Sequence, residues 1–432
     1  MTGAESSAPQ VPAAGLARRL GTGDAIVIGL GSMIGAGIFA VFAPAASVAG
    51  SGLLIGLAIA AVVAFCNATS SAQLAAQYPQ SGGTYLYGRE RLGEWAGFLA
   101  GWTFVIGKTA SCAAMALTCA TYAVPAGAAP WVAAAAVVAL ATVNCFGVTR
   151  TATATKVIVV AVLAVLVAVV VVGVAGGGPD TSNLTGDLLG HGWYGIAQSA
   201  GLVFFAFAGY ARIATLGEEV GDPRRAIPRA IVTALAITLV VYVAVGIAAL
   251  AVLGVDDLAS SQSPLVDLAT AGGGDGWATP VRIGAALAAL GALLALIAGV
   301  GRTALAMARN GDLPRALSRI EPRHRVPRRA EVSLAVVVVV LVLTVDLREA
   351  IGFSSFGVLL YYLIANAAAW TQRGDDRRYP RALQIIGAVG CVVLVATLPA
   401  TSIAIGVGVV AVGIGYRLVV QTIERRRPGV EI

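Results

Sequence analysis

Charged side chains are scarce in this sequence. They make up 12% of its 432 residues, whereas an average soluble protein carries about 25%. A large soluble domain needs charged residues to cover its surface, so the deficit excludes that class. Apolar residues make up 58%, and nearly uncharged runs of about 18 residues or more, long enough to cross a bilayer, recur along the chain. The composition predicts an all-α, multi-pass membrane protein.

Histidine, lysine and cysteine are also rare. Both histidines, His191 and His324, lie in predicted loops, so we expect no histidine-based catalytic or metal centre within the membrane. The five cysteines fall inside apolar runs, at spacings that match no metal motif, and we expect them to be reduced and buried. We therefore expect no metal, no cofactor and no catalytic residue; a coupling proton is the one additional species that we consider.

The arginines lie in short clusters between the apolar runs. If the N-terminus is cytoplasmic, every even-numbered connection is cytoplasmic as well, and these connections hold most of the arginines, notably at residues 302–329 and 373–381. The odd-numbered connections carry acids such as Asp180 and Asp256. This alternation follows the positive-inside rule and predicts that both termini are cytoplasmic. The net charge of +7 is then the orientation signal of a protein of the cytoplasmic membrane, in contact with lipid and not with nucleic acid.

About twelve membrane spans can be laid out from the apolar runs. They cover residues 25–46, 52–77, 96–123, 130–147, 155–175, 193–217, 228–254, 281–305, 331–346, 350–370, 382–399 and 402–421. The split between the last two spans has the weakest signal. The remaining ends, residues 1–20 and 423–432, are predicted to be a disordered tail and a basic tail, both cytoplasmic.

The first span carries four glycines in the stretch AIVIGLGSMIGAGIFA, residues 25–40. A dinucleotide-binding loop needs the spacing G-x-G-x-x-G and an acid about 20 residues later. Here the third glycine comes one residue too late, and residues 49–52 hold no acid. The stretch GWTFVIGKT, residues 101–109, imitates a phosphate-binding loop, but its glycines are one residue too far apart. Nucleotide binding is therefore rejected.

Two explanations of these glycines remain. Gly31 and Gly35 form a G-x-x-x-G helix-packing motif. The density of small residues at 32–36 instead favours a helix interrupted at mid-membrane, whose free N–H and C=O groups would bind the carboxylate and the ammonium of a zwitterion. A partner interruption is then expected five spans later, where residues 206–209 form a weak point flanked by aromatic residues. A repeat of five spans reverses its orientation, which predicts an inverted pair of repeats.

Four passages carry motifs of a known kind. They are GSMIGAGIF at 31–39, YPQSGGTYLYGRERLGEWAGFLAGW at 78–102, FFAFAGYARIATLGEEVGDPRRAIPRAI at 204–231 and GRTALAMARNGDLP at 301–314. Together they resemble the amino acid–polyamine–organocation (APC) superfamily of transporters. The resemblance implies a five-plus-five inverted repeat at residues 21–180 and 190–375, broken first and sixth helices, two additional helices at 380–422, and transport of amino acids or related amines by alternating access.

The resemblance also implies where substrate binds. At the first-helix break the matching residues are Ser32, Met33, Ile34, Gly35, Ala36 and Gly37. At the sixth-helix break they are Phe205, Ala206, Phe207, Ala208, Gly209 and Tyr210. The alternative role of the phenylalanines is packing against the core or against lipid.

This chain departs from the family pattern at two places. Relatives often carry an acid where this chain has Ala211, and several carry a lysine deep in the fifth helix, where residues 161–162 are apolar here. These losses favour a neutral or acidic amino acid over a cationic one.

Two basic residues, Lys108 and Arg212, lie away from the ends of the predicted spans, where a charge is costly and indicates function. Lys108 could exchange a proton, remain a permanent cation or meet a substrate carboxylate; the alternative is a structural lysine bonded to a carbonyl of a broken helix. Arg212 could line the pocket or pair with Glu218 or Glu219 in an inner gate.

We expect a secondary amino acid transporter that works by proton coupling or exchange. One alternative is an amine or polyamine transporter of the same fold; another is a non-transporting membrane sensor or a channel. A membrane enzyme would need a cluster of titratable residues at one depth of the membrane, and we identify only Lys108 and Arg212 there. The chain is therefore not expected to be an enzyme.

Overall fold

The computed structural model describes residues 20–80, 82–147, 152–186, 188–217, 219–321, 323–324 and 326–426. Within these residues the chain is helical, and the one pairing of β type is an isolated bridge between Leu20 and Val220. The predicted all-α class is confirmed for this part of the chain. The predicted N-terminal tail and most of the predicted C-terminal tail lie outside it.

The helices have the following bounds. They are α1 (Thr22–Met33), α2 (Ala36–Ala40), α3 (Phe42–Ala49), α4 (Leu53–Gln77), α5 (Thr84–Leu92), α6 (Glu94–Ala123), α7 (Ala129–Cys145), α8 (Ala152–Gly176), α9 (Ser182–Thr185), α10 (Gly192–Phe207), α11 (Ala211–Ala214), α12 (Pro223–Ser260), α13 (Pro264–Gly273), α14 (Ala278–Arg309), α15 (Arg328–Thr344), α16 (Leu347–Trp370), α17 (Arg381–Thr397) and α18 (Ala400–Arg426). Short 3-10 turns are η1 (Gly50–Gly52), η2 (Ala208–Tyr210), η3 (Asp275–Trp277), η4 (Arg315–Ser318) and η5 (Gly374–Asp376).

Nine described helical segments are long and apolar enough to cross a membrane. They are Thr22–Ala40, Phe42–Gln77, Glu94–Ala123, Thr153–Gly176, Gly192–Ala214, Pro223–Ser260, Asp275–Arg309, Leu347–Trp370 and Ala400–Ile423. Two of the predicted spans are shorter apolar helices, Ala129–Cys145 and Arg381–Thr397, and a third, α15, has 17 residues. The weakest predicted split, at 398–401, falls where α17 ends and α18 begins.

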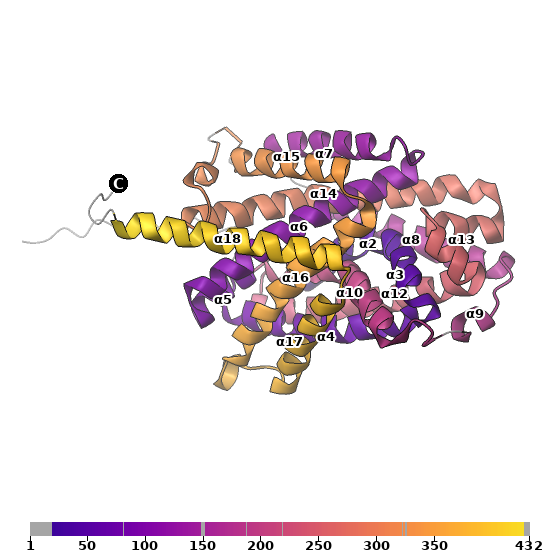
Figure 1. The fold of residues 1–432 in the computed structure, drawn as a ribbon, viewed down its shortest axis with the longest axis horizontal. Helices are drawn as coiled ribbons and strands as arrows, with labels where there is room; N and C mark the ends of the chain where they lie inside the picture. The colour runs from indigo at the N-terminus through magenta and orange to yellow at the C-terminus, as the bar shows by residue number, and fades with distance from the viewer. Residues whose placement is uncertain are drawn as a thin grey trace, which may run out of the picture.

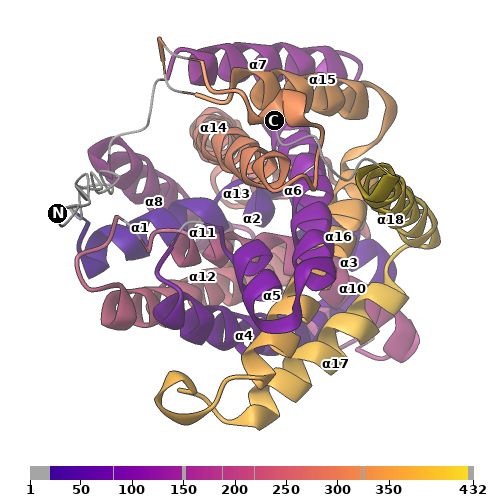
Figure 2. The same cartoon turned by 90° about the vertical axis from the view of Figure 1, so that its left-hand side faces the viewer.

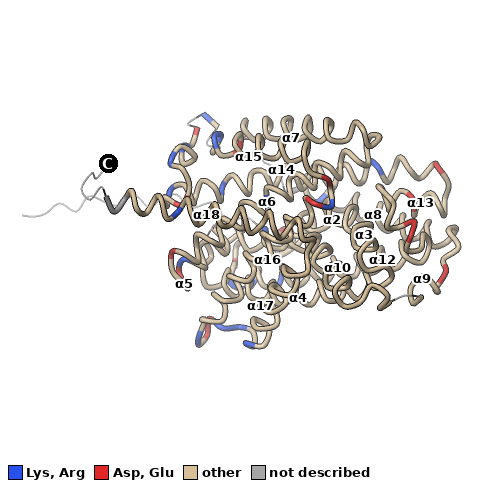
Figure 3. Tube along the Cα trace, in the orientation of Figure 1, with Lys and Arg blue, Asp and Glu red and all other residues tan. Residues whose placement is uncertain are grey.

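α14 and α18 run along the longest axis of the molecule, and other long helices such as α17 cross it at an angle (Figures 1 and 2). α6 lies near the centre and packs against both α14 and α16, while α7 and α15 pair on one side. α18 lies on the outside of the bundle. Most arginines and lysines gather toward the end that holds α5 and the loop after α14, and the middle of most helices is uncharged (Figure 3). An uncharged middle is the surface that a bilayer requires.

Two spans change their backbone geometry in mid-course. α1 ends at Met33. The next two residues, Ile34 and Gly35, are non-helical, and α2 starts at Ala36. α10 ends at Phe207 and passes through η2 into the short α11. The first is a true gap between helices, whereas the second only tightens to a 3-10 turn. The difference follows the sequence, because the first site is rich in glycine and the second is rich in alanine, a strong helix former.

Candidate functional site

The two interruptions touch each other through their backbones. A Cβ atom at Gly209 would collide with the carbonyl of Ser32 and lie 2.6 Å from the nitrogen of Met33. A Cβ atom at Gly37 would lie 2.7 Å from the Cα of Ala206. Only glycine allows this approach, which brings the carbonyl groups of two distant spans to one place. Gly37 and Gly209 therefore allow the backbones of the two breaks to come into contact.

Tyr242 of α12 bridges the two breaks. Its hydroxyl lies 2.6 Å from the Met33 carbonyl oxygen and 3.0 Å from the Ala206 carbonyl oxygen, and can donate to either. The side chain is fully buried, with its ring 5.0 Å from the ring of Phe207. Tyr242 was not predicted to lie at the site; a tyrosine inside the apolar run VVYVAV, residues 240–245, is the signal that could have identified it.

The Ala208 carbonyl is the second polar centre of the site. It accepts hydrogen bonds from Nζ of Lys108 at 3.2 Å and from the hydroxyl of Tyr362 at 3.3 Å. Lys108 is 7% exposed, and in the described part of the chain no acidic side chain pairs with it. The contact with a broken-helix carbonyl is the structural alternative foreseen for Lys108, and it places the ammonium group at the sixth-helix break.

The aromatic residues at the sixth-helix break are packed. Phe205 is 7% exposed, and Phe207 and Tyr210 are fully buried. The Tyr210 ring stacks on Tyr362 at 5.0 Å between centroids. In this conformation the three side chains fill the core around the break, as the packing alternative for the phenylalanines requires.

Gly35 faces another helix and not the sixth-helix break. A Cβ atom there would lie 2.8 Å from the Cβ of Ala292 in α14. Its neighbour Ala36 packs with Cys119 and Ala289. Gly31 approaches α8, where a Cβ atom would lie 3.1 Å from Val159. The two explanations of the glycine pattern therefore hold together, because Gly31 and Gly35 pack against neighbouring helices while the helix is interrupted beside them.

The residues expected to form an inner gate are arranged differently. Arg212 donates to the Thr215 hydroxyl at 3.3 Å, and within the described residues no ion pair joins it to Glu219. The Glu219 carbonyl instead accepts a hydrogen bond from the Leu20 amide at 3.0 Å. Glu218 lies outside the described residues.

Several charged contacts were missed from the sequence. Lys156 pairs with Asp24 at 2.6 Å, which ties α8 to the start of α1. Glu331, at the start of the predicted ninth span, is 2% exposed and lies against Gly301, so it is a buried carboxyl group that was not predicted. Of the cysteines expected to be buried, Cys145 is only partly buried, because it ends α7, while the other four are buried and all five are free.

A buried carboxylate also organises the arginine-rich end. Asp312, which follows α14, pairs with Arg417 of α18 and with Arg89 of α5 at 3.3 Å. The hydroxyl of Tyr85 donates to Asp312 at 2.8 Å, and burial raises the pKa of Tyr85 to about 12. This cluster joins the first half of the chain to its last helix.

Known proteins match this chain along most of its length. The family described as "Amino acid permease" matches residues 20–422. An uncharacterized transporter of Mycobacterium tuberculosis (strain ATCC 25618 / H37Rv) is 58% identical, over 95% of this chain and 93% of its own length. A branched-chain amino acid permease of Bacillus subtilis (strain 168) is 27% identical, over 86% and 84%. A chloroplastic cationic amino acid transporter of Arabidopsis thaliana is also 27% identical, over 80% and 64%.

Proposed function

Because this chain belongs to the amino acid permease family, and is therefore a membrane transporter and not an enzyme, we propose that it moves an amino acid across the cytoplasmic membrane by alternating access. Transport is coupled to protons or proceeds by exchange. The proposal includes twelve crossings, with the shorter helices α7, α15 and α17 added to the nine long spans, and cytoplasmic termini. Residues 21–180 and 190–375 are proposed as inverted repeats, since the interruptions lie five spans apart.

The observation that carries this proposal is the meeting of the two interruptions. The carbonyl oxygens of Met33 and Ala206 lie within hydrogen-bond distance of one hydroxyl, that of Tyr242. Two carbonyls so close together can receive the ammonium group of a small solute in place of that hydroxyl. A zwitterion also needs a partner for its carboxylate, for which the N–H groups after the first-helix break and the Lys108 ammonium are the candidates.

We propose that the substrate replaces the internal contacts of the site. Lys108 is a buried ammonium whose described hydrogen bond goes to a neutral carbonyl, that of Ala208. A substrate carboxylate would give it a charge-assisted hydrogen bond, which is roughly twice as strong as a neutral one. Its positive charge would repel a cationic side chain, and Ala211 supplies no compensating acid. A neutral or acidic amino acid is thus favoured over arginine or a polyamine.

Uptake by purified protein in liposomes tests the proposal. A panel of unlabelled amino acids and amines should compete with a labelled neutral amino acid, and the uptake should respond either to a pH gradient or to amino acid trapped inside. Competition by dibasic amines alone would favour the amine-transporter alternative. If no solute moves under any gradient although the protein is inserted, the transport mechanism is wrong and a sensor becomes the better explanation; flux that follows only the solute gradient would indicate a channel.

A further inference from the structure

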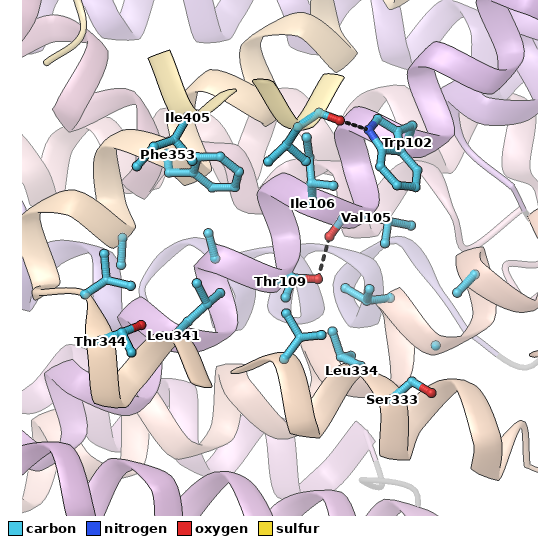
Figure 4. A pocket seen from close by; sticks show the side chains of 18 of the residues that line it. Trp102, Val105, Ile106, Thr109, Ser333, Leu334, Leu341, Thr344, Phe353 and Ile405 are labelled. Atoms are coloured by element: carbon cyan, nitrogen blue, oxygen red, sulfur yellow. Dashed lines mark hydrogen bonds between the residues drawn. The ribbon is translucent and has the colours of Figure 1, made fainter. Parts of the chain in front are cut away.

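An apolar groove runs along the outside of the bundle, away from the two breaks. Its volume is about 650 Å³, its floor is α6, and its walls are α15 and α18 (Figure 4). α16 closes one end with Phe353, and Leu313 and Leu317 of the loop after α14 lie at the other. The groove lies at the surface that faces lipid, since Val336 of α15 and Val407 of α18 are 59% and 57% exposed.

We propose that this groove binds one acyl chain of a phospholipid whose anionic headgroup lies at the arginine-rich end. The occupant is a molecule of the surrounding bilayer, and the site is separate from the proposed transport site. The proposal follows from the shape of the groove, from its lining and from the charges at its two ends.

The shape of the groove fits an extended chain. The lining residues of α15 run from Ala330 to Thr344, a length of about 21 Å at 1.5 Å per residue. That is most of a hydrocarbon core about 30 Å thick and more than one leaflet. The groove is therefore long and narrow along the helix axes, which suits an acyl chain better than a compact solute.

The lining of the groove excludes water as a stable filling. Aliphatic side chains dominate it, and two of the polar ones bond to their surroundings: Thr109 Oγ1 donates to the Val105 carbonyl at 2.6 Å and Trp102 Nε1 donates to the Val409 carbonyl at 3.0 Å. A water molecule needs two to four polar partners, which the aliphatic part of this lining does not supply. An empty groove would forfeit the dispersion contacts of its walls, so a hydrocarbon chain is the natural filling.

The two ends of the groove differ in charge. Arg315 lies between the lining residues Leu313 and Leu317, and Arg329 directly precedes the lining residue Ala330; both arginines are exposed. At the opposite end the lining includes the exposed carboxylate of Glu349, close to Asp346, and these two acids outnumber the one arginine there, Arg348. An anionic headgroup is attracted to the first end and repelled from the second, because clustered arginines next to a span attract anionic lipid.

A bound acyl chain would contact α6 and α16 on the sides that face away from the transport site. Thr109 lines the groove, and the adjacent Lys108 reaches the Ala208 carbonyl on the inner side of α6. Phe353 lines the groove on α16, the helix that also carries Tyr362. The lipid would therefore support the two helices that hold the polar centre of the site.

Photo-crosslinking tests the proposal with a readout independent of transport. The full chain is reconstituted with phosphatidylglycerol that carries a diazirine on one acyl chain, and labelled peptides are identified by mass spectrometry. Label should concentrate on the groove faces of α15, α18 and α6. Val337→Trp, which fills the groove, should lower this labelling about tenfold. This is the change in affinity expected if about two methylene groups of the acyl chain are no longer buried.

Val340→Trp is the matched control. Val337 lines the groove and is 50% exposed, whereas Val340 is 54% exposed on the same helix and is not part of the lining. Ile405→Trp repeats the test from α18, in case Val337→Trp does not fold. The same probe on phosphatidylcholine should label the groove less, and Arg315→Gln should remove that preference while Arg373→Gln keeps it.

Three results would overturn the proposal. One is labelling spread evenly over all lipid-facing helices and unchanged by Val337→Trp. Another is equal groove labelling by the two lipids, which rejects the anionic headgroup. The third is a dimer in nanodiscs that Val337→Trp, but not Val340→Trp, converts to a monomer, because the groove would then hold a second copy of the chain. A loss of transport with intact groove labelling would bear on the proposed function alone.

Discussion

The hydroxyl of Tyr242 lies between two carbonyl oxygens that are 173 residues apart in the chain, 2.6 Å from that of Met33 and 3.0 Å from that of Ala206. A hydroxyl has one proton, so only one of these carbonyls can hold it at a time. The other then receives no hydrogen bond from Tyr242, and a buried carbonyl gains from a further donor. The site is in this sense prepared for an additional donor such as a substrate ammonium group.

Tyr242→Phe removes this hydroxyl and keeps the ring that packs on Phe207. We expect a loss of about 1 kcal/mol in the free energy of unfolding and slower uptake, because the two breaks lose their common partner. Thermal unfolding in detergent and liposome uptake measure the two effects. Tyr194→Phe, at a tyrosine that is 59% exposed, should behave like the parent protein. If Tyr242→Phe does so as well, the bridge has no role in transport.

Gly209→Ala tests the close approach of the two breaks. The added methyl group would meet the backbone of Ser32 and Met33, which cannot move as a side chain can, so we expect a loss of about 1–3 kcal/mol together with loss of uptake. Gly299→Ala in α14 is the matched control, because a Cβ atom there meets nothing within 4 Å and alanine favours a helix interior by about 0.5–1 kcal/mol. Equal stability of the two variants would contradict the contact.

Gly35→Ala should impair the protein through α14. The new Cβ atom would lie 2.8 Å from the Cβ of Ala292, so the second change Ala292→Gly should restore stability and uptake together. The competing explanation is that a side chain at Gly35 occupies the place of the substrate carboxylate. In that case Ala292→Gly would restore stability but not uptake, and the comparison of single and double variants separates the two.

The sequence predicted the class of the fold and the position of both interruptions, because length, apolar runs and glycine density are local properties. α1 ends at Met33 and α10 at Phe207, within or next to the windows 32–36 and 206–209. The partners of the breaks could not be predicted in this way. Tyr242, Tyr362 and Ala292 reach the site only through tertiary packing, and a single sequence does not show which face of a uniformly apolar helix is turned inward.

Lys108→Met separates the functional and structural roles of this lysine. If the ammonium group meets the substrate carboxylate, uptake should fall about 10–100-fold, the equivalent of about 1.5–3 kcal/mol for a charged hydrogen bond, while stability changes little. Lys156→Met is the control, since this second lysine pairs with Asp24 outside the site and should retain uptake. A less stable Lys108→Met protein that transports normally would mean that Lys108 only supports the Ala208 carbonyl.

Among the ion pairs at the arginine-rich end, that of Asp312 and Arg417 should cost the most stability when it is broken, because both side chains are buried. Asp312 is 4% and Arg417 is 5% exposed, so Asp312→Asn leaves the buried guanidinium group with only the exposed carboxylate of Glu94, at 3.7 Å, at a cost of up to about 3–5 kcal/mol. Arg417→Gln in the same protein should recover part of this loss, because it removes a buried charge that has lost its buried partner. The control is Arg328→Gln at the ion pair with Glu321, where the arginine side chain is 61% exposed, and it should change stability by less than about 1 kcal/mol. Thermal unfolding in one detergent of the parent protein, both single variants, the double variant and the control measures these differences. Additive losses in the double variant would mean that the two residues act independently and that α18 is held by its apolar contacts instead.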